Sequence, residues 1–169
     1  LLVRTVLKAA TAPIVLDADA LNVLSPLRKP LRSFMGSNAP IVITPHPGEA
    51  ARLLGTTAAA VQKDRAAALR ELCRRSGAVV VLKGASTLVG DGAKCFVNRT
   101  GNPGMATGGS GDVLAGLLGA LLASGMEPFS AACLAVHVHG KAGDLVAQRG
   151  SERGLIASDL PMAIAEVLR

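Results

Sequence analysis

The stretch of sequence that decides the fold is NPGMATGGSGDVL, residues 102–114, where a glycine-rich loop runs directly into an apolar helical pattern. Backbone N–H groups at a helix start have no intrahelical acceptor, and the helix dipole makes that end positive. Glycine lets such a backbone approach a phosphate closely. Gly109, Ser110 and Gly111 are therefore candidates for binding an anion, and Asp112 is a candidate base for an attacking hydroxyl. The alternative is a helix N-cap after a flexible loop.

The composition indicates one globular domain with an aliphatic core. Half of the 169 residues are hydrophobic, but only three are aromatic, and all three are Phe. The net charge is +6, and the one short basic cluster, Arg70, Arg74 and Arg75, fits the exposed face of a helix. Because no aromatic platform accompanies these basic residues, we expect no nucleic-acid partner. The longest apolar run, residues 113–123, is too short to cross a bilayer, so we expect no membrane association.

The cysteines and the amino-terminal sequence indicate a cytoplasmic protein. The three cysteines are far apart and show no metal-binding spacing, so inert thiols in a reducing compartment are expected. No secretory signal is visible. The chain opens with Leu1 inside a helical pattern, which indicates the later part of a longer polypeptide.

Short apolar segments alternate with helical patterns along the chain. Strands are expected at residues 14–16, 41–44 and 78–82, and a hairpin is expected from residues 87–89 and 94–97 around an Asp-Gly turn. Helices are expected at residues 1–10, 18–24, 47–54, 57–75, 111–124, 128–148 and 158–168. Continuous apolar strands separated by helices predict a parallel sheet that is covered on both faces.

Polar residues follow the predicted strands at the points where ligands of such sheets collect. They are Asp17 with Asp19 and Asn22, His46 with Glu49, Lys83, and the loop leading to Asp112. Four strand ends that each deliver a polar or charged group favour a phosphate site over a simple helix cap.

Four stretches in this order resemble the NAD(P)H-hydrate dehydratase family of the ribokinase-like superfamily. They are DADALN (17–22), TPHPGE (44–49), VLKGAST (81–87) and NPGMATGGSGD (102–112), and HGKAGD (139–144) also fits. The resemblance implies an α/β fold, a three-layer αβα sandwich with a mostly parallel central sheet. It also implies that residues 1–169 are the carboxyl-terminal portion of a single dehydratase domain whose amino-terminal part is absent. Because such a piece exposes a sheet edge, we expect it to associate with that segment or to form a homo-oligomer.

The family implies a cofactor-repair lyase. Hydrated NADH or NADPH carries a hydroxyl on its nicotinamide ring; the enzyme phosphorylates this hydroxyl with ADP or ATP, and phosphate then leaves. Asp112 would be the catalytic base, and the amides around Gly109, Ser110 and Gly111 would form the anion hole.

The resemblance also implies binding roles for the other motifs. Substrate contacts would come from His46 and Asn102 beside Asp112, and Mg²⁺ would be held by Glu49 and Asp17. The nucleotide phosphates would meet Gly111 and the segment of Lys83, Gly84, Ala85, Ser86 and Thr87.

Simpler interpretations stand beside these roles. His46 would cap the next helix, Lys83 would be a solvated strand end, and Asn102 would only shape the turn before Pro103. Asp17 or Asp19 would be a helix N-cap.

Three other functions are compatible with parts of the sequence. One is a small-molecule kinase of the hydroxyethylthiazole kinase type, and another is a non-catalytic nucleotide-binding fragment. A Rossmann oxidoreductase is the weakest, because its glycines come early in the chain. Two histidines, His137 and His139, cannot share one helical face and are expected to be structural, and Gly140 and Gly143 are expected to permit close helix packing.

Overall fold

The computed structural model describes residues 2–169, which form a five-stranded sheet between two layers of helices. The strands lie side by side in chain order: β1 (Ile14–Leu16), β2 (Ile41–Ile43), β3 (Val79–Leu82), β4 (Leu88–Gly90) and β5 (Cys95–Val97). β1, β2 and β3 pair in parallel, whereas β4 is antiparallel to both β3 and β5. Four of the five strands therefore point the same way, which confirms the predicted mostly parallel sheet.

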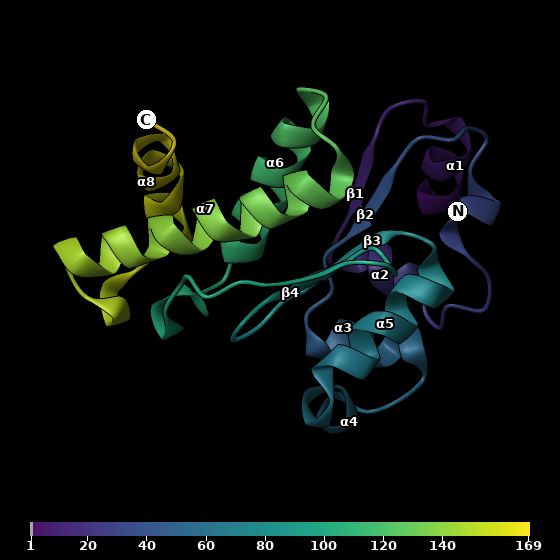
Figure 1. Ribbon diagram of the computed structural model, residues 1–169, viewed down its shortest axis with the longest axis horizontal. Helices are drawn as coiled ribbons and strands as arrows, with labels where there is room; N and C mark the ends of the chain where they lie inside the picture. Colours follow the sequence, from purple (N-terminus) through teal and green to yellow (C-terminus); the bar gives the residue numbers. More distant parts are fainter. Residues whose placement is uncertain (1) are drawn as a thin grey trace.

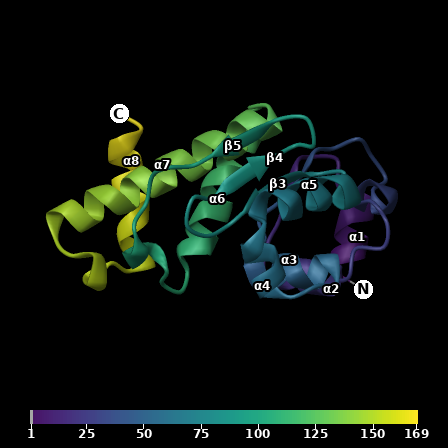
Figure 2. The same ribbon diagram turned by 60° about the horizontal axis from the view of Figure 1, so that its bottom comes forward.

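Helices cover both faces of this sheet (Figures 1 and 2). One layer contains α1 (Leu2–Ala9), α2 (Asp19–Val23), α3 (Pro47–Leu54), α4 (Ala58–Lys63) and α5 (Arg65–Ser76); the other contains α6 (Ser110–Ala123) and α7 (Pro128–Arg149). α8 (Leu160–Val167) packs against the far end of α7, beyond the sheet. Short 3-10 helices are η1 (Leu31–Phe34), η2 (Pro103–Met105), η3 (Glu152–Gly154) and η4 (Ala157–Asp159). Within residues 2–169, every helix is too short or too polar to cross a membrane.

Both faces of the sheet are apolar. Successive side chains of a strand point to opposite faces, and in these strands the residues on both faces are apolar. Ile41 and Ile43 of β2 join the core under α1 to α5, while Val42 between them joins the core under α6 and α7. The same alternation divides Val80 and Val81 of β3 between the two cores. This pattern explains why the strands read as continuous apolar runs in the sequence.

The prediction of one long helix at residues 57–75 is wrong, because the helix is interrupted at Asp64. α4 ends at Lys63 and α5 begins at Arg65, with Asp64 at φ −142° and ψ 81° between them. The Asp64 carboxylate accepts a hydrogen bond from Ala67 N at 2.8 Å. Aspartate competes with the helix for backbone donors, and here the local cap prevails over continuous helical structure.

Gly140 and Gly143 permit a close approach of α7 to the segment before the glycine-rich loop, where Gly140 faces Thr100 and Gly143 faces Met105 of the 3-10 helix η2. A Cβ on Gly140 would lie 2.2 Å from Thr100 Oγ1, and one on Gly143 would lie 2.3 Å from Met105 Sδ. The two glycines therefore let the segment that precedes the glycine-rich loop lie directly on α7.

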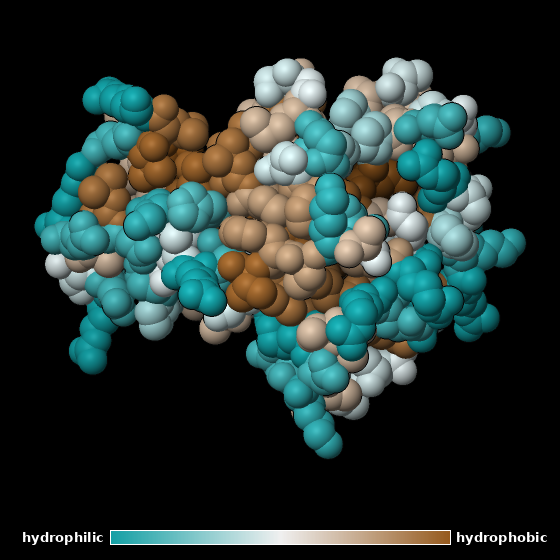
Figure 3. Space-filling view, viewed as in Figure 1, coloured by the Kyte–Doolittle hydropathy of each residue, from teal (hydrophilic) through white to brown (hydrophobic). Residues whose placement is uncertain are grey.

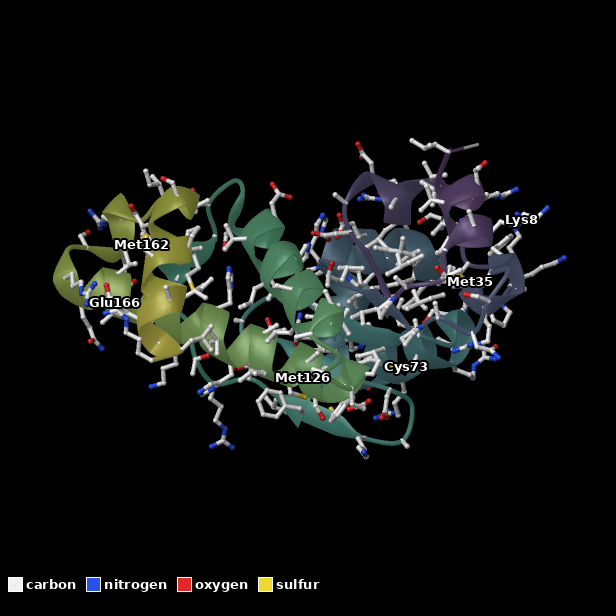
Figure 4. All side chains as sticks on the ribbon, turned by 90° about the horizontal axis from the view of Figure 1, so that it is seen from above. Lys8, Met35, Cys73, Met126, Met162 and Glu166 are labelled. Atoms are coloured by element: carbon white, nitrogen blue, oxygen red, sulfur yellow. The ribbon has the colours of Figure 1, made fainter. Side chains whose placement is uncertain are left out.

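Apolar side chains are exposed at both ends of the molecule, since Leu2 and Val6 of α1 are 77% and 49% exposed. Met162 and Glu166 of α8 lie at one end, and Lys8 and Met35 lie at the other (Figure 4). Apolar side chains reach the surface over α8, where Met162 is 72% exposed and Leu168 just beyond the helix is 52% exposed (Figure 3).

Candidate active site

Three charged side chains meet at the carboxyl ends of the parallel strands. Lys83, directly after β3, places Nζ 2.7 Å from Asp17 Oδ1 and 3.8 Å from Glu49 Oε2. Asp17 follows β1, and Glu49 lies in the first turn of the helix after β2. All three are largely buried, with side-chain exposures of 14% for Asp17, 5% for Glu49 and 19% for Lys83. The parallel register of β1, β2 and β3 thus gathers residues that are far apart in sequence.

The structure excludes two of the simpler interpretations of the sequence, one for Lys83 and one for Asp17 and Asp19. Lys83 is not a solvated strand end, because its ammonium group pairs with a carboxylate. Asp17 and Asp19 do not cap α2: its N-cap is Ala18, which provides no side-chain hydrogen bond. Asp19 instead accepts from Asn22 Nδ2 at 3.2 Å.

The start of α3 is closed by its own side chains. His46 Nδ1 accepts from the backbone N–H groups of Gly48 and Glu49, at 3.0 and 3.3 Å. The Glu49 carboxylate in turn accepts from His46 N at 2.7 Å, which completes a capping box. The capping interpretation of His46 is therefore confirmed. Because Nδ1 accepts, the ring proton is assigned to Nε2, which lies 3.5 Å from Glu49 Oε1.

The start of α6 is open. Its N-cap is Gly109, at φ 88° and ψ −16°, and no side chain caps the helix. Ser110 N donates to Thr107 O and Val113 N donates to Gly109 O, but the amides of Gly111 and Asp112 donate to no acceptor within residues 2–169. The Asp112 side chain is exposed and has no hydrogen-bond or ion-pair partner in the same residues.

The open turn of α6 faces the charged cluster. A Cβ built on Gly111 would lie 3.5 Å from Lys83 Nζ and 3.7 Å from Asp17 Oδ2. The structure therefore brings the glycine-rich loop together with the ends of β1 and β3. Free amides, a helix N-terminus and an ammonium group on one wall are the groups that bind a phosphoryl anion.

The loop after β3 is held by an arginine that the sequence analysis missed. Arg65 donates from Nη2 to Leu82 O at 3.0 Å and from Nη1 to Lys83 O at 3.3 Å. Its guanidinium group also lies against Gly84, which has φ 131°. The signal for this residue was Asp64, since recognising it as a cap would have placed Arg65 at the start of a helix.

His139 lies under the first turn of α6. It is 8% exposed, and its Nε2 is 3.0 Å from Ser110 O and 3.5 Å from Ser110 Oγ. Burial lowers the pKa of this imidazole, and the bond to Ser110 offsets part of that effect. His137 is exposed, so the two histidines do face different ways.

Within residues 2–169 the contacts of Asn102 are to α7 and to its own turn, and none of them is to the charged cluster. Its side chain accepts from Gly104 N at 3.1 Å and donates to Asp144 Oδ1 at 3.2 Å. Asp144 also accepts from Gly101 N at 3.0 Å. Asn102 thus shapes the turn before Pro103, and it also borders a groove of about 510 Å³ that Lys141, Asp144 and Glu152 help to line.

Residues 2–166 match the family model described as NAD(P)H-hydrate dehydratase. The chain belongs to this family.

Relatives of known name agree with this assignment. The ADP-dependent (S)-NAD(P)H-hydrate dehydratase of Neisseria meningitidis is 49% identical over 153 residues, which are 89% of this chain and 51% of that protein. The structure is similar to that of the ADP/ATP-dependent NAD(P)H-hydrate dehydratase from Bacillus subtilis co-crystallised with ATP and Mg²⁺, with a TM-score of 0.85 and 33% identity over 95% of this chain and 56% of that one. A ribokinase-like superfamily protein from Enterococcus faecalis matches with a TM-score of 0.76 and 26% identity over 98% of this chain and 57% of that one, which confirms the fold class.

The chain spans only part of these dehydratases. It covers 31% to 51% of the length of the curated relatives from Moorella thermoacetica and Neisseria meningitidis. In this part of the family fold, Asp17, Glu49, Lys83 and Gly111 share one site, with His46 linked to it through Glu49. Within residues 2–169 no group of three or more His, Cys, Asp or Glu side chains could hold a metal ion.

Proposed function

We propose that this chain is part of an enzyme that restores NADH and NADPH from their hydrated forms, with ADP or ATP as phosphoryl donor. The observation that carries the proposal is the first turn of α6, where the unpartnered Asp112 carboxylate stands beside free backbone amides. A base for a hydroxyl and donors for a phosphoryl group are the two requirements of this transfer. The relative from Neisseria meningitidis is named for the same reaction.

The proposed reaction has two steps. In the first, the ring hydroxyl oxygen forms a bond to the terminal phosphorus of the nucleotide, the bond from that phosphorus to its bridging oxygen breaks, and Asp112 takes the hydroxyl proton. In the second, the bond between the ring carbon and the phosphate oxygen breaks, the neighbouring carbon loses a proton, and the double bond of the nicotinamide ring returns. The amides of Gly109 and Gly111 stabilise the transferred group, because placement and charge dominate phosphoryl transfer. The amide of Ser110, which the sequence analysis also assigned to this role, already donates to Thr107 O.

The nucleotide and Mg²⁺ are assigned to the charged cluster. Lys83 and the following Gly84, Ala85, Ser86 and Thr87 contact the nucleotide phosphates together with Gly111. Asp17 and Glu49 hold Mg²⁺, since this ion takes one or two carboxylates and completes its shell with water and phosphate oxygens. When bound, the ion neutralises charge on the transferred phosphoryl group. The co-crystals of the Bacillus subtilis relative with ATP and Mg²⁺ support the choice of nucleotide and ion.

The substrate is assigned to the open side of the cluster. His46 and Asn102 contact the hydrated nicotinamide beside Asp112. His46 presents an imidazole that is half exposed at 50%, and Asn102 borders the groove along α7.

The active unit is proposed to be larger than residues 1–169. We infer that they are the carboxyl-terminal portion of one dehydratase domain, which associates with an amino-terminal segment and forms a homo-oligomer. Within residues 2–169 the outer edge of β1 pairs with no strand, and unpaired edges invite a partner. The cytoplasm is the proposed location, since the three cysteines are free thiols.

The test is direct repair of the substrate. The full-length protein is incubated with hydrated NADH, Mg²⁺ and either ADP or ATP, and recovery of NADH absorbance is followed. We expect recovery with at least one nucleotide and none without nucleotide. No recovery with either nucleotide would overturn the proposal, and phosphorylation of hydroxyethylthiazole instead would favour the kinase alternative.

A further inference from the structure

The side chain of His139 reaches the peptide group that the proposed anion hole uses. Its Nε2 lies 3.0 Å from Ser110 O. A carbonyl oxygen only accepts, so Nε2 carries the hydrogen and donates it. Burial lowers the pKa of His139, so the protein environment disfavours the charged form of the ring.

The oxygen that accepts this bond belongs to the same planar group as a free amide. Ser110 C=O and Gly111 N–H form one peptide unit, so the orientation of one determines the orientation of the other. A hydrogen bond to the oxygen polarises the unit and strengthens the N–H as a donor. Gly111 N–H has no acceptor within residues 2–169, and Gly111 faces Lys83.

We propose that His139 is a positioning residue that orients and polarises the Ser110–Gly111 peptide group, so that Gly111 N–H meets the transferred phosphoryl group. The inference rests on the function proposed above. His139 acts through the peptide group and does not touch the substrate. A buried imidazole suits this task because its ring is rigid and is held in place by the residues packed around it on the buried side of α7.

Other groups of α7 accept hydrogen bonds from the segment that leads to the same loop. Val136 O accepts from Asn98 Nδ2 at 3.1 Å, His137 O accepts from Thr100 Oγ1 at 2.9 Å, and Asp144 accepts from Gly101 N. These bonds fix the start of the segment that leads to Gly109. His139 extends the same support to the first turn of α6, where the segment ends.

The chain offers a matched control two residues away. His137 lies on the same helix but is exposed, and its imidazole has no hydrogen-bond partner within residues 2–169. Replacing it changes the histidine content of α7 without changing the contact to Ser110. His137→Leu is therefore expected to behave as the wild type.

The kinetic test uses four versions of the full-length protein: wild type, His139→Leu, His139→Gln and His137→Leu. Loss of one hole donor costs about 10²–10³-fold in kcat, so weakening one is expected to cost about tenfold. His139→Leu should therefore lower kcat about tenfold with the KM for each substrate nearly unchanged. His139→Gln has an amide N–H that reaches about as far as Nε2 of histidine, so this variant should recover most of the lost kcat. Equal kcat values for His139→Leu and His137→Leu, or a change in KM alone, would overturn the inference.

A spectroscopic readout separates this inference from the proposed function. The ¹⁵N chemical shift of the Gly111 amide reports hydrogen bonding to Ser110 O without any turnover. We expect it to move in His139→Leu, to return toward the wild-type value in His139→Gln and to stay unchanged in His137→Leu. If His139→Leu does not fold, His139→Asn, whose amide is too short to reach Ser110 O, replaces it. An unmoved Gly111 resonance overturns the inference, whereas a wild type without repair activity overturns only the proposed function.

Discussion

Two helices begin at the charged cluster and carry a carboxylate at the same position, yet their first turns are built in opposite ways. Glu49 is the third residue of α3, and Asp112 is the third residue of α6. Glu49 is buried and accepts the backbone N–H of His46, whose ring caps the helix in return. Asp112 is exposed and without a partner in residues 2–169, and its helix starts at Gly109 without a side-chain cap.

The difference shows how one structural element serves two purposes. A capping box satisfies the backbone donors at a helix start internally, so the first turn of α3 is a rigid support that places Glu49 beside Lys83. An uncapped start leaves its donors and its positive dipole end for a ligand, so the first turn of α6 is the part that binds and reacts.

The largest effect is expected at the free carboxylate. Asp112→Asn removes the proposed base and should lower the rate of NADH recovery by about 10²–10⁴-fold. Nucleotide binding should persist, and the free energy of unfolding should fall by no more than about 1 kcal/mol from the lost interaction with the helix dipole. Isothermal titration with ADP or ATP and urea unfolding check the last two expectations.

Glu49→Gln is the matched variant in the other helix. Glutamine completes a capping box as glutamate does, so stability should stay close to the wild type. We expect a loss of activity that added Mg²⁺ partly restores, whereas added Mg²⁺ should not restore Asp112→Asn. Rescue of both variants by Mg²⁺ would mean that the two carboxylates do not differ in role.

The next effect concerns the glycine that leaves α6 uncapped. Gly109→Ala forces an alanine to φ 88° and brings its Cβ to 3.0 Å from Ala157 Cβ, so it should lower the free energy of unfolding by about 1–2 kcal/mol or slightly more. Gly55→Ala, at φ 70° after α3, carries a similar strain with open space around it. Both variants should lose stability in urea, but only Gly109→Ala should lose kcat. Equal activities would place the glycine-rich turn outside the reaction.

A smaller effect is expected when the α3 cap is broken. His46→Ala removes the acceptor for two backbone N–H groups and should lower the free energy of unfolding by about 0.5–2 kcal/mol. His46→Asn keeps an acceptor at the N-cap and should retain most of this stability. Urea unfolding of both variants decides the point, and identical curves for them would argue against a capping role.

The smallest effect is a pH dependence of stability from His139. Burial lowers its pKa in the folded protein, while the unfolded chain has the ordinary value of about 6.5. Below that value the unfolded state binds more protons, so the free energy of unfolding decreases as pH falls. His139→Gln should therefore lose less stability than the wild type between about pH 7.5 and about pH 5.5 in urea titrations. A steeper loss in the variant would contradict the burial effect.

Local sequence signals predicted most of the elements. Pro47 and Gly55 mark the two ends of α3, and the Asp-Gly pair at 91–92 marks the β4–β5 hairpin. The prediction of one helix at residues 57–75 was wrong because helical periodicity continues across Asp64. Only the cap geometry at Asp64 reveals that the helix is interrupted there. His139 was expected to be merely structural, since no sequence pattern shows that α7 crosses under the start of α6.

The sequence by itself determined the chemistry available at each strand end: a carboxylate after β1, a His-Glu pair after β2, a lysine after β3 and an open glycine-rich helix start. These choices are local, because turns, caps and apolar periods depend on neighbouring residues. Only the tertiary structure decided which of them meet. Parallel pairing places Asp17, Glu49 and Lys83 within reach of one another, and the packing of α7 under α6 joins His139 to Ser110. Such contacts span 29 residues or more of chain and arise from burial of the sheet on both faces, which no short stretch of sequence encodes.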